Sequence, residues 1–364
     1  MKKICILGAT GSIGTQALDV IRRTPNLCLH SFSYHGNASL AKAIEEEFHP
    51  KRTVCTAIED ASSLESLVED DEVDIVLHSI TGTAGIRAAV TALRAGKKVA
   101  LANKETLVAA GSLVMKENTE HLIPVDSEHS AIYQCLHGSL KADDIESVVL
   151  TASGGPFRFL SYDEIRSKKA SEALKHPNWN MGRKISIDSA TMMNKGLEII
   201  EAMHLFDLRL SQIEVLIHPE SIIHSMVRFL DGSLLAELSK PDMRQPIHFA
   251  LTGRKNLELN RLDFAALGKM SFFKPDLQVF PCLRLAMEAA EAGGILPAVL
   301  NAANEVAVEA YLQDRISFYE IASVIEDVMD ATVNEPLTDL KQLEDSILLS
   351  KQTAADSVSR IMSS

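Results

Sequence analysis

Cysteine is scarce in this chain of 364 residues, which contains only five. They are odd in number, far apart, and include no Cys-x-x-Cys pair: Cys5, Cys28, Cys55, Cys135 and Cys282. Disulfide frameworks and thiolate zinc sites both depend on even or closely spaced sets of cysteines. The sequence therefore predicts reduced, mostly buried thiols, as in a protein of the cytoplasm.

Long hydrophobic runs are also lacking. The N-terminal stretch MKKICILGATG holds four apolar residues before the glycines begin, too few for the core of a signal peptide. No apolar run approaches the roughly 18 residues that a membrane-spanning helix needs. We therefore expect a soluble, cytoplasmic protein without a membrane partner.

Basic residues are outnumbered by acidic ones. The chain has 36 Lys and Arg residues against 49 Asp and Glu residues, which gives a formal net charge of −13. A nucleic-acid-binding protein normally carries a basic patch or stripe, so this balance argues against a nucleic-acid partner. The net charge does not exclude an anionic substrate, because a pocket on an acidic protein can be locally basic.

Strands and helices alternate over the first 125 residues. The apolar runs KICIL (3–7), LCLHSFSY (27–34), VDIVLHSI (73–80) and KVALA (98–102) are strand candidates, and segments with helical spacing separate them. This alternation predicts right-handed βαβ units and a Rossmann-like, doubly wound parallel sheet, so the fold class is α/β. We assign residues 1–125 to this domain.

The regular alternation of strands and helices ends after about residue 145. The segments IEVLIH, IHSMVRFL and SLLAEL indicate strands, and the hairpin dipeptide Asp231-Gly232 separates the last two. We predict a central α+β domain over residues 126–252 with a largely antiparallel sheet. A linker over 253–278 and a C-terminal α-helical bundle over 279–364 complete the predicted organisation.

A glycine-rich turn follows the first strand. Gly8, Gly11 and Gly14 are spaced G-x-x-G-x-x-G between a strand and a helix, where backbone amides can approach a pyrophosphate. The spacing departs from the usual G-x-G-x-x-G, so the prediction of dinucleotide binding depends on the position of the turn. The second strand ends at SYHGNAS, which offers no carboxylate for a ribose and therefore favours NADP over NAD.

Three carboxylates have the spacing of a candidate metal site. Asp126 and Glu128, if extended, point to one side about 6.6 Å apart, and the alternative is a solvated loop. Asn194, Lys195 and Glu198 share a helix face because they are three or four residues apart. If that face meets Asp126 and Glu128, the all-oxygen set suits Mg²⁺ or Mn²⁺ rather than zinc.

Donors suited to a phosphate or phosphonate gather in the same region. They are Ser153, Gly154, Gly155, His176, Ser189, Asn194 and Lys195. Each alone is more often a turn residue or a cap, but together they indicate a pocket for an anion. Residues 153–183 are polar, lack apolar periodicity and contain the only tryptophan, Trp179, so we predict a mobile lid there.

Six motifs resemble those of the 1-deoxy-D-xylulose 5-phosphate reductoisomerase family. They are GATGSIG, ALANKETLV, PVDSEHSAIYQCL, SGGPFR, HPNWNMGRKISIDSATMMNKGLEIIEA and VLIHPESIIHSMV. The likeness continues through ALNAANEVAV in the 300s and so covers nearly the whole chain. The resemblance implies an NADPH-dependent enzyme, usually a homodimer, that uses Mg²⁺ or Mn²⁺. Such enzymes convert 1-deoxy-D-xylulose 5-phosphate to 2-C-methyl-D-erythritol 4-phosphate in non-mevalonate isoprenoid precursor biosynthesis.

The same resemblance implies roles for individual residues. The implied metal ligands are Asp126, Glu128 and Glu198, and the implied catalytic residues are Lys104, Glu128 and Glu198. The implied substrate contacts are Lys104, Ser127, Glu128, Ser153, His176, Trp179, Ser189, Asn194, Lys195 and Glu198. The implied cofactor contacts are Thr10, Gly11, Ser12, Ile13, Gly36, Asn37, Asn103, Glu105 and Gly182. Family members often carry a basic residue after the glycine at position 36, where this chain has Asn37.

Two other functions are compatible with parts of the sequence. One is another metal-assisted NAD(P)-dependent oxidoreductase that acts on a small phosphorylated or hydroxy-acid substrate. The other is a non-catalytic redox sensor that binds a dinucleotide and a partner protein. Metal-dependent turnover of a phosphosugar separates both from the reductoisomerase.

Overall fold

The computed structural model describes residues 1–60, 62–136, 142–177, 179 and 181–363. The chain folds into two compact units. The N-terminal unit comprises Met1–Thr106, Val114–Ser130 and Asp242–Asn260, and the C-terminal unit comprises Leu107–Leu113, Ala131–Pro241 and Arg261–Ser364. Among the described residues, no helix combines the length and the apolar composition that a membrane span requires.

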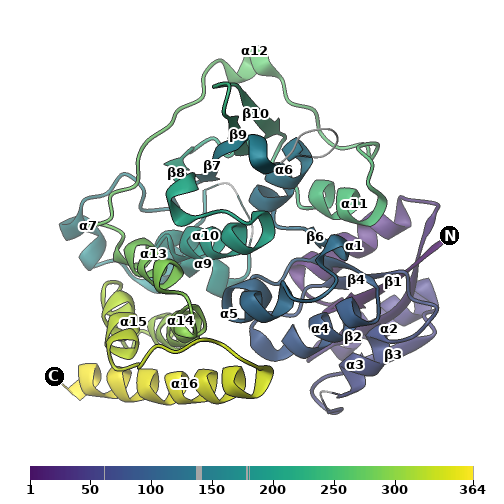
Figure 1. Ribbon diagram of the computed structural model, residues 1–364, viewed down its shortest axis with the longest axis horizontal. Helices are drawn as coiled ribbons and strands as arrows, with labels where there is room; N and C mark the ends of the chain where they lie inside the picture. The colour runs from purple at the N-terminus through teal and green to yellow at the C-terminus, as the bar shows by residue number, and fades with distance from the viewer. Residues whose placement is uncertain (61, 137–141, 178, 180, 364) are drawn as a thin grey trace. The chain divides into compact units, whose positions relative to one another are not determined.

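A six-stranded parallel sheet of order β3-β2-β1-β4-β5-β6 forms the centre of the N-terminal unit (Figure 1). Its strands are β1 (Lys2–Leu7), β2 (Leu27–Tyr34), β3 (Arg52–Cys55), β4 (Ile75–His78), β5 (Lys98–Leu101) and β6 (Leu122–Pro124). Because β2 lies on one side of β1 and β4 on the other, the sheet is doubly wound, and the order reverses beside β1. The predicted parallel sheet is confirmed.

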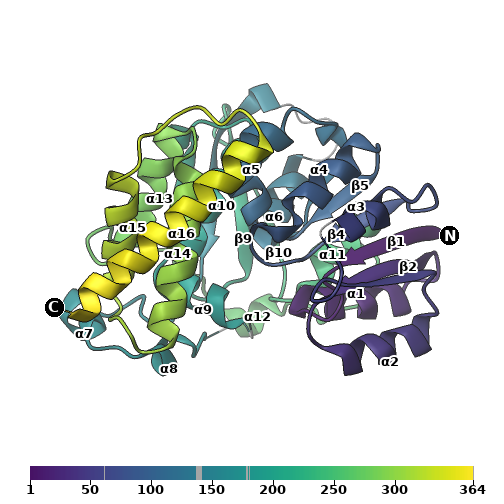
Figure 2. The ribbon, with the colours of Figure 1, turned by 90° about the horizontal axis from the view of Figure 1, so that it is seen from below.

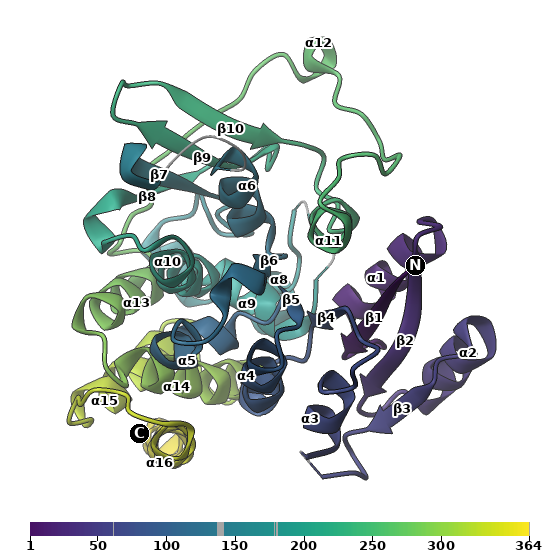
Figure 3. The ribbon, with the colours of Figure 1, turned by 45° about the vertical axis from the view of Figure 1, so that its right-hand side comes forward.

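Helices cover this sheet, and they bury its strands. They are α1 (Ser12–Arg22), α2 (Ala38–Phe48), α3 (Ser62–Val68), α4 (Ile86–Arg94) and α11 (Arg244–Thr252), with the short 3-10 helices η1 (Thr83–Gly85) and η2 (Thr119–His121). Ile4, Ile6 and Leu77 are fully buried, which explains why these strands read as continuous apolar runs. Helix α11, far from α1 in the sequence, lies beside α1 (Figure 3).

A four-stranded mixed sheet of order β10-β9-β7-β8 belongs to the C-terminal unit. Its strands are β7 (Ile145–Ala152), β8 (Ile213–Ile217), β9 (Ile223–Phe229) and β10 (Leu234–Leu238). Strand β9 pairs antiparallel with β7 and β10, so the predicted hairpin at Asp231-Gly232 is confirmed. Strand β8 pairs parallel with β7, which the sequence pattern did not indicate.

The helices of the C-terminal unit include the predicted bundle. They are α7 (Tyr162–Arg166), α8 (Ala170–Ala173), α9 (Arg183–Ala190), α10 (Met193–Phe206), α12 (Phe264–Leu267), α13 (Pro281–Ala292), α14 (Leu296–Leu312), α15 (Glu320–Asp330) and α16 (Leu340–Ser363), with the 3-10 helices η3 (Ala142–Asp144) and η4 (Leu210–Gln212). Helices α5 (Glu105–Val114) and α6 (Ser127–Leu136) contribute residues to both units. Helices α13 to α16 pack together, and α16 crosses α14 (Figure 2).

Helix α10 is central to the C-terminal unit because it packs against α13 without space for a larger residue. A Cβ atom placed on Gly196 would lie 2.3 Å from Cβ of Ala286. Part of the predicted linker over 253–278 also packs on this unit, since Phe273 forms an antiparallel bridge with Ile217 of β8. The division into three domains with a linker stays a prediction.

Candidate active site

The glycine-rich turn joins β1 closely to α1. Gly8 has a φ of +89°, and a Cβ on Gly14 would lie 2.4 Å from the carbonyl oxygen of Gly8. Gly11 is the N-cap of α1 and provides no side-chain cap, and both Gly11 and Ser12 are exposed. The first amides of α1 can therefore donate to an anion such as a pyrophosphate, so the turn suits a dinucleotide. The predicted cofactor residues of this turn are Thr10, Gly11, Ser12 and Ile13.

Asn37 begins the helix that follows β2. Its Oδ1 atom accepts from the Leu40 amide at 3.1 Å and from the Ser39 hydroxyl at 3.0 Å, which caps α2. The neighbouring Gly36 is exposed, and a Cβ there would meet nothing within 4 Å. Because the oxygen of Asn37 holds the helix, its amide nitrogen is the part of this side chain suited to donate to a phosphate.

Asn103 ties two turns together at the carboxyl ends of β4 and β5. Its Nδ2 atom donates to the carbonyls of Ile80 (2.7 Å) and Gly82 (3.0 Å) and to the Glu105 carboxylate (2.7 Å). Its Oδ1 atom accepts from the Thr106 amide at 2.8 Å. Dinucleotides bind at this edge of a doubly wound sheet, so Asn103 and Glu105 lie where a cofactor contact is expected.

The segment that carries Asp126 and Glu128 is the start of a helix rather than an extended strand. Helix α6 begins at Ser127, so neither the extended geometry considered for this segment nor the alternative loop occurs. The helix N-terminus stabilises negative charge, and one carboxylate oxygen from each of Asp126 and Glu128 lies within 4.8 Å of the other. The Ser127 hydroxyl donates to Glu128 at 2.6 Å, and Lys104 forms an ion pair with Asp126.

The ion pair between Lys104 and Asp126 is largely shielded from water. The side chain of Lys104 is 11% exposed and that of Asp126 is 14% exposed. Two neighbouring carboxylates repel each other unless a cation lies beside them, and here the Lys104 ammonium provides the positive charge. Hard oxygen ligands of this kind suit a divalent cation such as Mg²⁺ or Mn²⁺.

In the C-terminal unit, Ser153, His176 and Trp179 form a connected group. The Trp179 amide donates to Nδ1 of His176 at 2.9 Å, so in the neutral ring Nε2 carries the proton and donates it to Ser153 Oγ at 2.8 Å. The Gly155 amide donates to the same oxygen at 3.1 Å. Ser153 therefore accepts two hydrogen bonds, and its own hydroxyl proton can be donated to an anion.

The neutral state of His176 leads to a testable prediction. Burial, aided by the positive charge of Arg158, lowers the pKa of His176 to about 4. An unfolded chain would bind this proton near pH 6.5. The neutral ring therefore stabilises the fold above pH 6.5, and this contribution is lost as the pH falls from 6.5 toward 4. Histidine ring NMR signals, assigned with His176→Gln, should titrate near pH 4; titration near 6.5 would contradict the Trp179 hydrogen bond.

A glycine turn places Ser153 beside the end of α9. Gly154 and Gly155 both have positive φ angles, and a Cβ on Gly155 would lie 2.6 Å from the carbonyl oxygen of Ser189. This contact brings Ser153 and Ser189 to neighbouring backbone segments. The two predicted anion-binding hydroxyls therefore belong to one part of the C-terminal unit.

The first turns of α10 carry a buried polar cluster. Glu198 is 1% exposed, and it accepts hydrogen bonds from the Asn194 amide and the Lys195 ammonium. Lys195, 3% exposed, also donates to the carbonyl oxygen of Thr151 at the end of β7. The predicted helix face of Asn194, Lys195 and Glu198 is confirmed as a set of mutual contacts. A carboxylate buried with an ammonium group could exchange this partner for a divalent cation.

The predicted lid contains regular structure. Residues 153–183 include α7 and α8, and Ile165 and Ala173 are fully buried. The Tyr311 hydroxyl of α14 donates to the carbonyl oxygen of Lys168 at 3.0 Å. Gly182, a predicted cofactor contact, is the exposed N-cap of α9. Residues 178 and 180 of this segment lie outside the described residues, and the mobility of the lid stays a prediction.

Sequence reasoning missed two contributors in the C-terminal unit. The Thr151 carbonyl holds Lys195, and a backbone acceptor leaves no signal in the sequence. The ring of His224 lies 6.2 Å from that of Trp179, measured between centroids. His224 belongs to the apolar run of β9, where a histidine reads as an ordinary strand residue.

Models of one family match most of the chain. The 1-deoxy-D-xylulose 5-phosphate reductoisomerase model matches residues 4–70 and 51–111, its C-terminal domain model matches 122–206, and the DXP reductoisomerase C-terminal domain model matches 238–356. The 1-deoxy-D-xylulose 5-phosphate reductoisomerase of Clostridium tetani is 49% identical over 358 residues, which cover 90% of this chain and 92% of that protein. That of Chlorobium chlorochromatii is 48% identical over 356 residues, with 91% and 93% coverage.

Solved structures show the same likeness. A crystal structure of DOX-P reductoisomerase in complex with NADPH, fosmidomycin and magnesium is 38% identical in sequence, with a TM-score of 0.91. The alignment covers 99% of this chain and 98% of that one. The 1-deoxy-D-xylulose 5-phosphate reductoisomerase of Zymomonas mobilis in complex with NADPH is 39% identical, with a TM-score of 0.87 and 98% and 99% coverage.

Proposed function

Because the chain belongs to the 1-deoxy-D-xylulose 5-phosphate reductoisomerase family, we propose that the residues described above form the active site of such an enzyme. The protein is an NADPH- and divalent-metal-dependent reductoisomerase that converts 1-deoxy-D-xylulose 5-phosphate to 2-C-methyl-D-erythritol 4-phosphate. The observation that carries the site assignment is the buried α10 cluster, in which Glu198 contacts Lys195 and Asn194. Another metal-assisted oxidoreductase is set aside, because models of this one family match residues 4–111, 122–206 and 238–356.

The proposed metal ligands are Asp126, Glu128 and Glu198. Their chemistry supports Mg²⁺ or Mn²⁺, because all donors are carboxylate oxygens and each of Asp126 and Glu198 contacts an ammonium group where a cation would bind. When bound, the cation acts as a Lewis acid toward the carbonyl and hydroxyl oxygens of the substrate. Lys104 and Glu128 are the proposed groups that hold and move protons beside these oxygens.

The proposed phosphate pocket consists of side chains of the C-terminal unit. Ser153, held by His176, directs its hydroxyl proton outward, and Ser189 follows on the adjoining backbone segment. Asn194 and Lys195 would add an amide and a positive charge. Lys195 contacts Glu198 and Thr151 in this structure, so we propose that it exchanges one of these contacts for a phosphate oxygen. Binding at the phosphate end contributes energy remote from the reacting carbons.

The proposed cofactor site follows the glycine turn of the N-terminal unit. The uncapped amides of α1 would bind the pyrophosphate, and NADPH when bound supplies the hydride. Asn37 would donate to the 2′-phosphate without a full positive charge. Trp179 is proposed to cover the substrate and to exclude water when the lid closes. The other proposed cofactor contacts are Thr10, Ser12, Ile13, Gly36, Asn103, Glu105 and Gly182. Ser127 is proposed as a substrate contact.

A direct assay of NADPH consumption tests this function. Mixing the protein with 1-deoxy-D-xylulose 5-phosphate and NADPH should lower the NADPH absorbance in the presence of Mg²⁺ or Mn²⁺, and a chelator should stop the reaction. Parallel runs with NADH measure the role of Asn37, and a weak preference for NADPH is expected. If neither metal supports NADPH consumption, the proposed function is wrong.

We also propose a homodimer that works in the cytoplasm, where its reduced thiols would persist. Strand β10 is an edge strand, and Leu234 and Leu235 on it are 49% and 43% exposed. An apolar edge strand of this kind is a surface that a second copy can cover. Light scattering should give about twice the chain mass of 39.8 kDa, and Leu235→Lys should shift the protein toward monomers. A monomeric wild-type protein would contradict the proposal.

A further inference from the structure

A buried carboxylate lies next to the proposed phosphate pocket without belonging to it. Asp188, in α9, is 1% exposed and directly precedes Ser189. Its carboxylate accepts from Asn304 Nδ2 at 2.8 Å and pairs with Lys184 Nζ at 3.0 Å. Asn304 belongs to α14 and is itself fully buried. A charged group is therefore held by two helices in the interior of the C-terminal unit.

Stability alone does not explain this arrangement. Taking a carboxylate out of water costs several kcal/mol, and buried ion pairs often stabilise a fold no better than apolar residues of similar size. Among the described residues, Oδ1 of Asn304 has no hydrogen-bond partner, which adds a further cost. Only the nitrogen of this amide makes a hydrogen bond among the described residues. Such a bond fixes position more than it adds stability.

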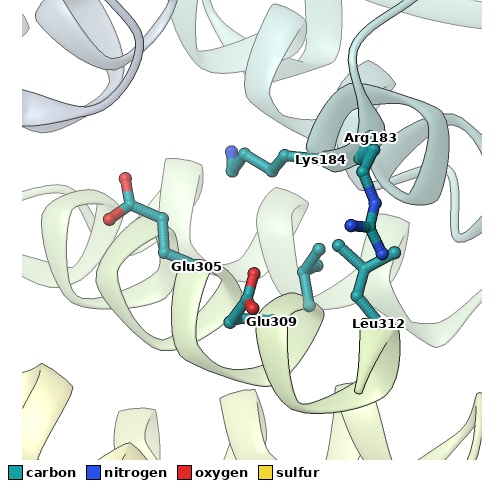
Figure 4. Close-up of a pocket in the computed structure, with 6 residues that line it drawn as sticks. Arg183, Lys184, Glu305, Glu309 and Leu312 are labelled. Atoms are coloured by element: carbon teal, nitrogen blue, oxygen red, sulfur yellow. The ribbon is translucent and has the colours of Figure 1, made fainter. Parts of the chain in front are cut away.

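The two partners of Asp188 differ in their surroundings. Lys184 is 30% exposed in its side chain and lines a pocket of about 270 Å³ between α9 and α14. Figure 4 shows Arg183 and Lys184 of α9 facing Glu305, Glu309 and Leu312 of α14 across this pocket. The Lys184 contact is therefore partly screened by solvent, whereas the Asn304 contact is not. Asn304 is the partner that fixes the carboxylate.

The last turn of α9, which Asp188 anchors, sets the positions of the proposed phosphate ligands. The carbonyl oxygen of Ser189 accepts from the Met192 amide at 3.2 Å, and Met192 has a φ of +59° at the corner before α10. Helix α10 begins at Met193, so Asn194 and Lys195 follow at once. A shift of the last turn of α9 would therefore displace Ser189 and the first turn of α10 together.

We propose that Asp188, held by Asn304, is a positioning residue for recognition of the substrate phosphate. It fixes the last turn of α9 so that the Ser189 hydroxyl and the start of α10 are preset for the phosphate. This inference depends on the proposed function, since it assigns a role within the same site. Asp188 and Asn304 themselves contact neither substrate nor cofactor.

Steady-state kinetics of Asp188→Ala and Asn304→Ala test the inference. Each change should raise KM for 1-deoxy-D-xylulose 5-phosphate about tenfold, which corresponds to about 1.4 kcal/mol. The value of kcat should change much less, because the loss concerns a binding contact remote from the reaction. The Kd for NADPH, measured by fluorescence, should stay as in the wild type. The double variant should raise KM no more than Asp188→Ala alone, since both substitutions remove the same hydrogen bond.

A matched control separates positioning from a general loss of stability. Asn301→Ala removes an equally buried asparagine one turn earlier in α14, whose Nδ2 donates to Glu305 of the same helix at 3.2 Å. It should lower Tm without raising KM. If Asp188→Ala does not fold, Asn304→Ala carries the test, since it removes a neutral side chain. The inference would be overturned if the control raised KM as much as the two variants do, or if KM stayed unchanged in both variants. With an active wild-type enzyme, either result would leave the proposed function standing. An inactive wild type would overturn both.

Discussion

Replacing Glu198 with Gln is expected to lower kcat/KM for 1-deoxy-D-xylulose 5-phosphate by about 10³-fold, because several kcal/mol of metal-based charge stabilisation would be lost. The substitution keeps the shape of the side chain and removes its charge. Glu198 is the only one of the three proposed ligands on α10, where Asn194 and Lys195 already donate to it. The neutral amide would bind a divalent cation weakly and would leave the Lys195 ammonium without its carboxylate.

Two measurements check this prediction. Calorimetric titration with Mn²⁺ should show weaker binding to Glu198→Gln, and the NADPH absorbance assay should show the lower rate. Asp207→Asn is the matched control, because it makes the same change at the exposed C-cap of α10, where the left-handed backbone suits either residue. The control should retain wild-type rate and metal affinity. Undiminished metal binding by Glu198→Gln would show that the ligand assignment is wrong.

Replacing Gly14 with Ala should weaken NADPH binding by about 100-fold, the effect of losing one hydrogen bond to a charged group. The added Cβ would lie 2.4 Å from the Gly8 carbonyl oxygen and 2.5 Å from Cα of Ala9, and both are backbone atoms that cannot rotate away. Helix α1 would have to move off the turn. Its uncapped amides would then lose their approach to the pyrophosphate.

Fluorescence titration with NADPH measures this effect, and a thermal melt measures the accompanying loss of stability, about 1 to 3 kcal/mol for an overpacked site. Thr15→Ala provides the control in the same turn of α1. Thr15 is exposed, and its hydroxyl donates to the carbonyls of Gly11 and Ser12 within its own helix. This variant should bind NADPH as the wild type does. Wild-type affinity in Gly14→Ala would mean that the cofactor does not depend on close packing of α1 on the turn.

Local patterns account for most of what could be predicted. The alternation of buried strands with helices predicted the parallel sheet, since β1, β2, β4 and β5 are recognisable from short apolar runs such as KICIL, whereas β3 and β6 were not predicted. The shared face of Asn194, Lys195 and Glu198 followed from helical spacing alone, and the structure confirms their contacts. Motif likeness identified the family, because motif matches depend on residue identity and not on packing.

Some helix starts and the contacts between distant segments escaped prediction. Asp126 and Glu128 were considered in an extended segment or a loop, yet a helix begins between them at Ser127. The parallel pairing of β8 with β7 and the use of the Thr151 carbonyl by Lys195 also had no local signal. Asn37 was assigned only to a cofactor, whereas its oxygen also caps α2.

Local sequence patterns therefore predicted the α/β class, the glycine turn, the polar face of α10 and the family. The tertiary structure alone decided which buried groups meet, as when Asn304 of α14 donates to Asp188, 116 residues earlier. The physical reason is the range of the interactions. Periodicity and capping act over a few residues, whereas the position of a buried carboxylate is set by helices whose packing no single segment encodes.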